Sequence, residues 1–150
     1  MIAKAGFTVQ TGGYSGVMEA VSRGANEAGG HVIGITSNQI EIYRPIEVNQ
    51  WVVEETKYST LQERLIHLVT RCDAAIAMPG GIGTLTELSL VWNFMQVGEI
   101  PLCPLIAVGK LWQRTLSDFL RTDYVIPKDV NLIQFADTPK TAIDLLKSSL

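Results

Sequence analysis

Short apolar segments alternate with longer amphipathic segments along the chain, and this alternation constrains the fold more than any other feature. The strand-like segments cover residues 7–11, 31–36, 73–78, 104–109 and 132–135. Helical periodicity occurs between them, near residues 16–28, 60–71, 84–97, 111–121 and 139–149. Such an order is typical of an α/β fold, in which an open, mostly parallel sheet carries helices on both faces.

Residues that start and stop helices support these boundaries. Gly29 and Gly30 are placed to end the first helix, Ser59 or Thr60 to cap the second, and Thr138 with Pro139 to start the last. Residues 37–58 are the least regular part. There we predict a loop with one short strand near residues 51–53, which could shape a substrate pocket.

Composition limits the classes of protein to consider. With 150 residues and 47% hydrophobic content, the chain fits a single compact domain over residues 1–150. The net charge of -3 and scattered basic residues argue against a nucleic-acid partner. No apolar segment approaches the roughly 18 residues of a membrane span, and the first residues do not resemble a signal peptide. We therefore expect a cytoplasmic protein without a membrane partner.

Cysteine and histidine are too few to indicate a structural metal or a disulfide framework. Cys72 and Cys103 are the only cysteines, and His31 and His67 do not have metal-ligand spacing. We expect no metal and no cofactor.

The segment "AIAMPGGIGTLTELSL" breaks an apolar strand with Pro79 and three glycines before an apolar helix begins. The first N–H groups of such a helix lack partners, and glycines allow a ligand to approach them. With the helix dipole and the Thr84 hydroxyl, this is a site for the phosphate of a small molecule. The segment has no P-loop lysine, and Thr86 stands where a dinucleotide motif has its third glycine. A tight strand-to-helix turn explains Gly80, Gly81 and Gly83 equally well.

Glu87 allows two interpretations. Thr84 and Glu87 have the spacing of a capping box, in which the Glu87 carboxylate would bond back to the Thr84 N–H. Helical geometry, however, places Glu87 on the apolar side of the helix, between Leu90, Val91 and Phe94, next to the predicted phosphate site. We favour a functional role for this carboxylate.

Arg64 and a second glycine loop are further candidates. Arg64 borders the apolar stripe of the helix near residues 60–71, where it could reach over the strand ends or lie at the rim with its head group in water. His67 is better explained as a surface or rim residue than as a catalytic one. Gly12, Gly13 and Gly16 repeat the strand, glycine and helix order and would also allow a ligand to approach closely.

Together these residues resemble a known family. The segment "PGGIGTLTE" at 79–87 is similar to the PGGxGTxxE signature of the Lonely Guy family, the lysine-decarboxylase-like phosphoribohydrolases of cytokinin ribosides and other nucleoside 5'-monophosphates. The segments "TGGYSGVMEAVSRGANEAGGHVIGIT" and "ERLIHLVTRCDAAIAMPGG" resemble the family's glycine loop and its arginine-bearing helix. The resemblance covers residues 1–147. It implies a Rossmann-like fold and a homodimer or higher homo-oligomer.

The resemblance also implies an activity and the residues that carry it. The activity is hydrolysis of the N-glycosidic bond of a nucleoside 5'-monophosphate, such as a cytokinin riboside monophosphate or an AMP-like molecule, to free base and ribose 5-phosphate. Arg64 and Glu87 match the family's catalytic residues. The residues that match its substrate and phosphate contacts are Gly12, Gly13, Gly16, Met18, Gly80, Gly81, Gly83 and Thr84. The alternative is a noncatalytic binding or carrier protein for a nucleotide or a phosphorylated cofactor.

Two further expectations follow from the family pattern. Members begin with a strand, a loop and a helix, of which only the end of the helix matches residues 1–6 here, so we expect the family's first strand to be missing. That strand would lie beside the one that ends at Met78. In addition, the residues do not indicate a pyridoxal Schiff base, and we do not expect a lysine decarboxylase.

Overall fold

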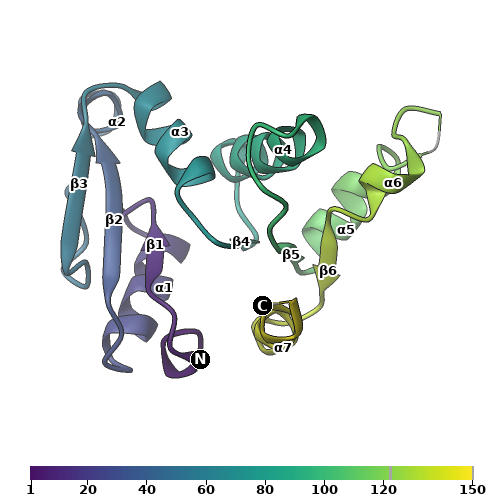
Figure 1. Ribbon diagram of the computed structural model, residues 1–150. Helices are drawn as coiled ribbons and strands as arrows, with labels where there is room; N and C mark the ends of the chain where they lie inside the picture. Colours follow the sequence, from purple (N-terminus) through teal and green to yellow (C-terminus); the bar gives the residue numbers. More distant parts are fainter. Residues whose placement is uncertain (122, 150) are drawn as a thin grey trace. The chain divides into compact units, whose positions relative to one another are not determined.

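The computed structural model describes residues 1–121 and 123–149, and the chain forms two compact units, Met1–Arg71 and Cys72–Leu150. Each unit is described by itself. Both contain a three-stranded parallel sheet with helices packed against it (Figure 1). This is the Rossmann-like α/β fold that the sequence predicts. That the two units form one domain, and that a first strand is missing, both stay predictions.

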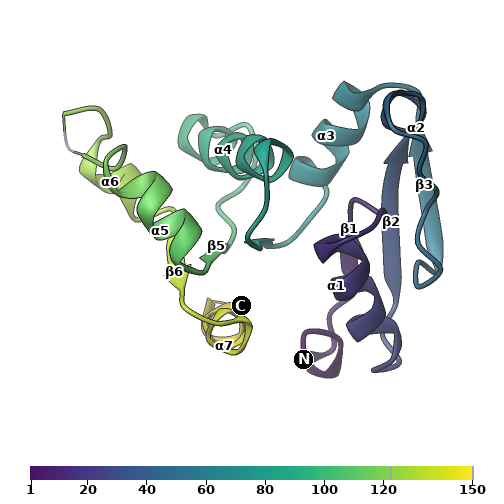
Figure 2. The ribbon, with the colours of Figure 1, turned by 180° about the vertical axis from the view of Figure 1, so that it is seen from behind.

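Unit 1 carries its strands in chain order, β1, β2 and β3, side by side in both views (Figures 1 and 2). Val9 pairs with Val32, and Ile33 with Glu54. Its elements are Ala3–Ala5 (η1, a 3-10 helix), Val9–Thr11 (β1), Val17–Asn26 (α1), Val32–Ser37 (β2), Asn38–Tyr43 (α2), Glu54–Tyr58 (β3) and Leu61–Thr70 (α3).

The two long helices of unit 1 cover opposite faces of its sheet. Val9 and Val32 form a buried cluster with Ala25 of α1, which lies in front of the strands in Figure 2. Gln10 lies between two residues of this face and points the other way, because successive strand residues alternate between faces. Its side chain meets His67 of α3. The ends of β1 and β2 therefore lie between α1 and α3.

Unit 2 also carries its strands in chain order, β4, β5 and β6. All four residues of β5 are buried, as expected for a central strand covered on both faces. Its elements are Ala75–Ala77 (β4), Ile82–Val97 (α4), Leu105–Val108 (β5), Lys110–Ser117 (α5), Pro127–Val130 (α6), Gln134–Ala136 (β6) and Pro139–Ser149 (α7).

Helix α4 is apolar on most sides, and the sequence left open whether it lies in the core or against a second subunit. Four of its side chains are buried, at Leu88, Val91, Trp92 and Met95. The Trp92 indole N–H donates to the carbonyl of Asp129 at 2.9 Å, and the Met95 sulfur accepts from the N–H of Cys103 at 3.3 Å. This face of α4 thus belongs to the core of its own unit.

The predicted helix boundaries agree with the structure at three places. Thr60 caps α3 and forms a complete capping box with Glu63. Gly29 has a left-handed φ of 76°, and the Gly30 N–H bonds to the carbonyl of Ala25 beyond the end of α1. Thr138 accepts from the N–H of Thr141 at the start of α7.

The prediction for residues 37–58 was wrong in two respects. The segment begins with a helix, α2, and the Ser37 side chain caps it by accepting from the N–H of Ile40, an N-cap that the prediction did not include. The strand is β3 at Glu54–Tyr58 and not residues 51–53. Because β3 is an edge strand of its sheet, its residues are mostly polar and exposed. It therefore lacks the apolar alternation by which strands are predicted from sequence.

Candidate functional site

Met18 and Arg64 pack directly on Gly12, which follows β1. A β-carbon built on Gly12 would overlap the Arg64 guanidinium and lie 2.6 Å from the Met18 sulfur. A side chain at this position would therefore displace the Arg64 guanidinium and the Met18 sulfur from where they now lie. The structure brings together Gly12, Met18 and Arg64, three residues that the sequence assigned to one site.

Arg64 is buried, with 6% of its surface exposed. Its Nε donates to the carbonyl of Ile35 at 2.7 Å, and its Nη2 donates to the carbonyl of Gly12 at 3.4 Å. The guanidinium carbon also lies 5.8 Å from the centre of the Tyr14 ring, within cation–π range. Of the two positions considered, Arg64 takes the one over the strand ends, and its head group does not lie in water.

Tyr14 fixes the glycine loop from inside, and it is the residue that the sequence interpretation most clearly missed. Its ring is 1% exposed, and its hydroxyl accepts from the N–H of Ser37 at 2.9 Å. Burial raises the pKa of this hydroxyl, so it stays protonated at neutral pH. A large aromatic residue inside "GGYSG" was an available signal of an anchored loop.

Gly13 and Gly16 both have left-handed backbone conformations, with φ of 78° and 75°. At Gly13 a β-carbon would also lie 2.9 Å from the Thr36 methyl group and 3.3 Å from the Cα of Gly34. The N–H of Gly13 donates to the Thr11 hydroxyl at 3.1 Å. Unlike a flexible linker, this loop has a defined shape that β2 supports.

His67 lies one turn after Arg64 and has a partner on each ring nitrogen. The Tyr58 hydroxyl is 2.7 Å from Nδ1, and the side-chain amide oxygen of Gln10, Oε1, is 3.1 Å from Nε2. The Gln10 oxygen can only accept, so Nε2 carries the proton and Nδ1 accepts from Tyr58. Burial, and to a smaller extent the Arg71 cation, lowers the pKa of His67. This neutral, partly buried histidine fits the expected rim position.

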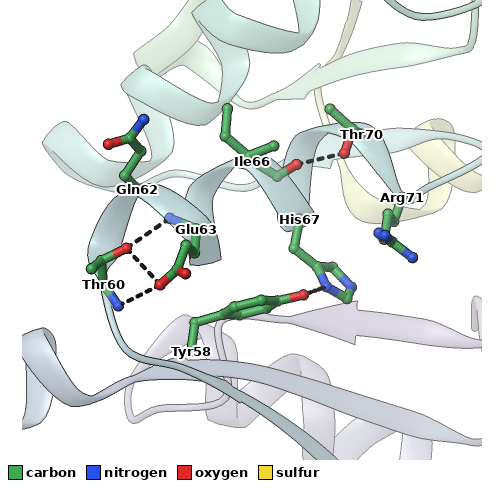
Figure 3. A pocket seen from close by; sticks show the side chains of 8 residues that line it. All are labelled: Tyr58, Thr60, Gln62, Glu63, Ile66, His67, Thr70 and Arg71. Atoms are coloured by element: carbon green, nitrogen blue, oxygen red, sulfur yellow. Dashed lines mark hydrogen bonds between the residues drawn. The ribbon is translucent and has the colours of Figure 1, made fainter.

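A wide, shallow pocket of about 550 Å³ lies on one side of α3. Figure 3 shows its lining, with the Thr60 and Glu63 capping box at one end and the His67 and Tyr58 pair below the helix. It is lined by Tyr58, Thr60, Gln62, Glu63, Ile66, His67, Thr70 and Arg71. None of the ten predicted site residues lines it, so this hollow is separate from the residues of the glycine loop.

In unit 2 the glycine segment runs from β4 into α4. The Trp112 indole N–H donates to the carbonyl of Met78 at 3.0 Å, which holds the chain just before Pro79. Helix α4 begins at Ile82, and its first backbone bond runs from the Leu85 N–H to the carbonyl of Gly81 at 3.1 Å. The N–H groups of residues 82–84 precede that bond and form the amino-terminal end of the helix dipole.

The backbone does not demand glycine at Gly80, Gly81 or Gly83, since none of the three has a left-handed φ. A β-carbon at Gly80 would collide with the Thr84 hydroxyl, whereas at Gly81 and Gly83 it would meet no atom of the described residues within 4 Å. The tight-turn explanation therefore accounts for Gly80 alone. At Gly81 and Gly83 the space beside the helix end is left open.

Glu87 does not cap its helix. The N-cap of α4 is Gly81, which places Thr84 as the third helical residue and Glu87 as the sixth. A capping box requires its first member at the N-cap itself, as Thr60 is in α3. The capping interpretation of Glu87 is therefore wrong. The side chain lies half-buried in the second turn of α4.

Cys72 and Cys103 precede adjacent strands of unit 2 as free thiols. Burial raises the pKa of Cys72 to about 11 and also raises that of Cys103. Both thiols are therefore poor nucleophiles at neutral pH. Within residues 1–121 and 123–149 no three His, Cys, Asp or Glu side chains are grouped so that they could hold a metal ion.

The predicted site residues thus fall into two sets. Unit 1 holds Gly12, Gly13, Gly16, Met18 and Arg64 at the carboxyl ends of β1 and β2. Unit 2 holds Gly80, Gly81, Gly83, Thr84 and Glu87 where β4 leads into α4. In parallel α/β sheets this end of the strands is the usual place for a ligand. Over the same described residues, no helix has the length and apolar content to cross a membrane.

Comparison with known proteins gives one family and two kinds of relative. The family model described as "Possible lysine decarboxylase" matches residues 18–146. A probable cytokinin riboside 5'-monophosphate phosphoribohydrolase of Oryza sativa subsp. japonica is 31% identical over 145 residues, which are 93% of this chain and 58% of that protein. A cytokinin riboside 5'-monophosphate phosphoribohydrolase of Mycobacterium tuberculosis is 29% identical over 95% of this chain and 78% of its own length. The chain spans less than two thirds of two rice relatives that it matches, at 58% and 57%.

Solved structures supply the second kind of relative. The molybdenum cofactor binding protein from Rippkaea orientalis has a TM-score of 0.73 and 28% identity, over 98% of this chain and 80% of that one. The molybdenum cofactor carrier protein from Chlamydomonas reinhardtii has a TM-score of 0.72 with 24% identity, which shows a shared fold. The chain is thus similar in sequence to proteins named as enzymes, and it shares its fold with solved structures named as cofactor-binding or carrier proteins.

Proposed function

Since the chain belongs to the family described as possible lysine decarboxylases, whose relatives here are named phosphoribohydrolases, we propose that it binds a nucleoside 5'-monophosphate and hydrolyses its N-glycosidic bond. Water adds to C1' of the ribose as the bond from C1' to the base nitrogen breaks. The base leaves with a proton, and the second product is ribose 5-phosphate. The family's description notwithstanding, we do not propose lysine decarboxylation.

The observation that carries this proposal is the open space at Gly81 and Gly83. Neither glycine is required by its φ or by a neighbouring atom of the described residues, and both flank the positive end of a 16-residue helix. A phosphate placed there would accept from the N–H groups of residues 82–84, and the Thr84 hydroxyl is available to it as a further donor. The absence of side chains at positions 81 and 83 is what allows that approach.

Glu87 and Arg64 have separate roles in the proposed reaction. The ribosyl group gains positive charge as the bond to the base breaks, and the Glu87 carboxylate stabilises that charge and orients the attacking water. Arg64 holds the sugar or its phosphate by charge-assisted hydrogen bonds. Its contacts with Gly12 and Ile35 fix the direction of the guanidinium before a ligand arrives.

A carrier is the second candidate, favoured by the likeness to the Rippkaea orientalis protein. The same glycine segments would then hold a phosphorylated cofactor or nucleotide, and Glu87 would have no reaction to assist. Formation of homodimers and a cytoplasmic location belong to both candidates and stay predictions.

Glu87→Gln separates the two candidates, with Glu99→Gln as the matched control. Glutamine keeps the size of the side chain, and Glu99 is an exposed carboxylate just beyond α4 whose replacement changes the net charge equally. Free base released from AMP and from a panel of other nucleoside monophosphates is measured by chromatography, and AMP affinity by calorimetry. We expect Glu87→Gln to lower turnover by on the order of 10² to 10⁴ while AMP affinity is kept. The segment proposed to bind the phosphate, residues 79–84 (the phosphate segment), is unchanged in this variant.

The other outcomes are equally clear. A wild-type protein that binds AMP or another monophosphate without releasing base is a carrier. A wild type that releases base, together with a Glu87→Gln variant that releases it equally fast, shows that the proposed role of Glu87 is wrong.

A further inference from the structure

Asn49 lies in the irregular segment between α2 and β3, yet it makes the densest set of contacts with the Gly12 to Gly16 loop. Its side chain is buried, with 9% of its surface exposed. Nδ2 donates to the carbonyl of Gly13 at 2.9 Å and to that of Tyr14 at 3.0 Å. The Asn49 main-chain N–H donates to the same Gly13 carbonyl at 2.8 Å.

Asn49 is itself held in place. Its Oδ1 accepts from the N–H of Trp51 at 3.1 Å, so the amide orientation that presents Nδ2 to the loop is fixed. Its carbonyl accepts from the N–H of Val52 at 3.1 Å, and the next N–H, of Val53, bonds to β2 at Val32. The amide group is therefore anchored to the sheet on one side and bonded to the glycine loop on the other.

From these contacts we infer that Asn49 is a positioning residue that directs the N–H groups of Tyr14 and Ser15 toward the ligand. The peptide bonds of the described chain are trans. In a trans peptide the C=O and the following N–H point in opposite directions. Asn49 binds the carbonyls of Gly13 and Tyr14, so the N–H groups of Tyr14 and Ser15 point away from it. Successive N–H groups of this kind bind an oxygen atom of an anion or another acceptor.

This inference rests on the proposed function only for the identity of the ligand, a nucleoside monophosphate. The conformation of the loop itself is also restricted by Gly13, which has a left-handed φ, and by Tyr14, which is buried. Without the amide of Asn49, the buried carbonyl of Tyr14 loses its side-chain donor, and that of Gly13 keeps only the main-chain N–H of Asn49. The peptide group between Tyr14 and Ser15 is then free to rotate.

Asn49→Asp is the test, and Asn26→Asp is its matched control. Aspartate keeps the shape and the acceptor for Trp51, but it places an oxygen against the carbonyls of Gly13 and Tyr14. Asn26, at the end of α1, donates its side-chain amide to the carbonyl of Trp51 at 3.3 Å. Trp51 lies in the same irregular segment as Asn49, but this bond does not involve the glycine loop. Both variants thus replace an amide donor to a backbone carbonyl by a carboxylate.

Two measurements are made on each variant. Amide NMR signals of Tyr14 and Ser15 report the loop without ligand, and calorimetry gives the affinity for AMP and for inorganic phosphate. We expect Asn49→Asp to shift or broaden both amide signals and to weaken AMP binding by about 10- to 100-fold, with phosphate binding at residues 82–84 within about twofold of wild type. Asn26→Asp is expected to match wild type in all three.

Unchanged Tyr14 and Ser15 signals in Asn49→Asp overturn the inference. So does an AMP affinity that falls equally in both variants, because a general loss of stability then explains it. A wild type without affinity for nucleoside monophosphates defeats the proposed function instead, and the amide signals of the two variants then decide the role of Asn49 by themselves.

Discussion

Replacement of Trp112 by phenylalanine tests whether α5 holds the phosphate segment in place. Trp112 is 2% exposed, and its indole N–H donates to the carbonyl of Met78, the last residue before Pro79. Trp92 is the matched control. It is 8% exposed, donates to the carbonyl of Asp129 in the same unit, and contacts α6 instead of the phosphate segment.

The expected loss of stability is similar for the two variants. A carbonyl left without its partner costs about 1 to 3 kcal/mol. The smaller phenylalanine ring removes buried apolar surface and leaves a small cavity, which adds about 1 to 2 kcal/mol. Each variant should therefore lose about 2 to 5 kcal/mol of the free energy of unfolding, measured by urea titration with far-UV circular dichroism.

The two variants should differ in ligand binding. Trp112→Phe frees the chain at Met78, so the phosphate segment samples more conformations and AMP binding weakens by about tenfold or more. Trp92→Phe leaves that segment in place, and its AMP affinity should stay within about twofold of wild type. Equal AMP affinities in two folded variants would refute the idea that Trp112 positions this segment.

Three further outcomes are expected. Thr84→Ala should weaken AMP binding by about 10- to 100-fold and adenine binding hardly at all, whereas Thr84→Ser should resemble wild type, because only the hydroxyl meets the charged phosphate. Because the pKa of His67 is lowered by folding, the unfolded chain binds a proton at this residue more readily, and the free energy of unfolding should fall as pH drops below about 6.5. Urea titrations at several pH values should show that His67→Gln makes this dependence on pH less steep. In a Cys103→Ala background, Cys72, with a pKa of about 11, should react with a disulfide reagent at pH 8 about 10²-fold more slowly than free cysteine, and a rate equal to that of the unfolded chain would contradict its burial.

The regular part of the fold could be predicted from the sequence because its strands are apolar and its helices carry strong start and stop residues. Ser59 or Thr60, and Thr138 before Pro139, are local signals that predicted two helix starts, and the structure has Thr60 as the cap of α3 and Thr138 at the start of α7. The residues of β3 gave no such signal, since an exposed edge strand does not need apolar alternation. Similarly, Ser37 is both the last residue of β2 and the N-cap of α2. Its capping role could not be predicted because the helix that follows it was not predicted.

The candidate site shows the same division. Glycine spacing and the family resemblance located both loops, but not the residues that hold them in shape. Asn49 and Trp112 each donate to backbone carbonyls that lie 34 to 36 residues away along the chain. Tyr14 holds its loop through the backbone N–H of Ser37. Contacts of this kind depend on how strands and helices come together, which residue spacing does not encode.

The close approach of the glycine loop to β2 has a consequence for substitution tolerance. Gly34 lies within a regular strand, where a β-branched residue would ordinarily be favoured. A β-carbon there would lie 2.9 Å from both methyl groups of Val52 and 3.3 Å from the Cα of Gly13. Strand propensity and packing therefore oppose each other at this one position. In a saturation mutagenesis screen Gly34 should behave like a turn glycine, and variants there should recover only when Val52 is made smaller.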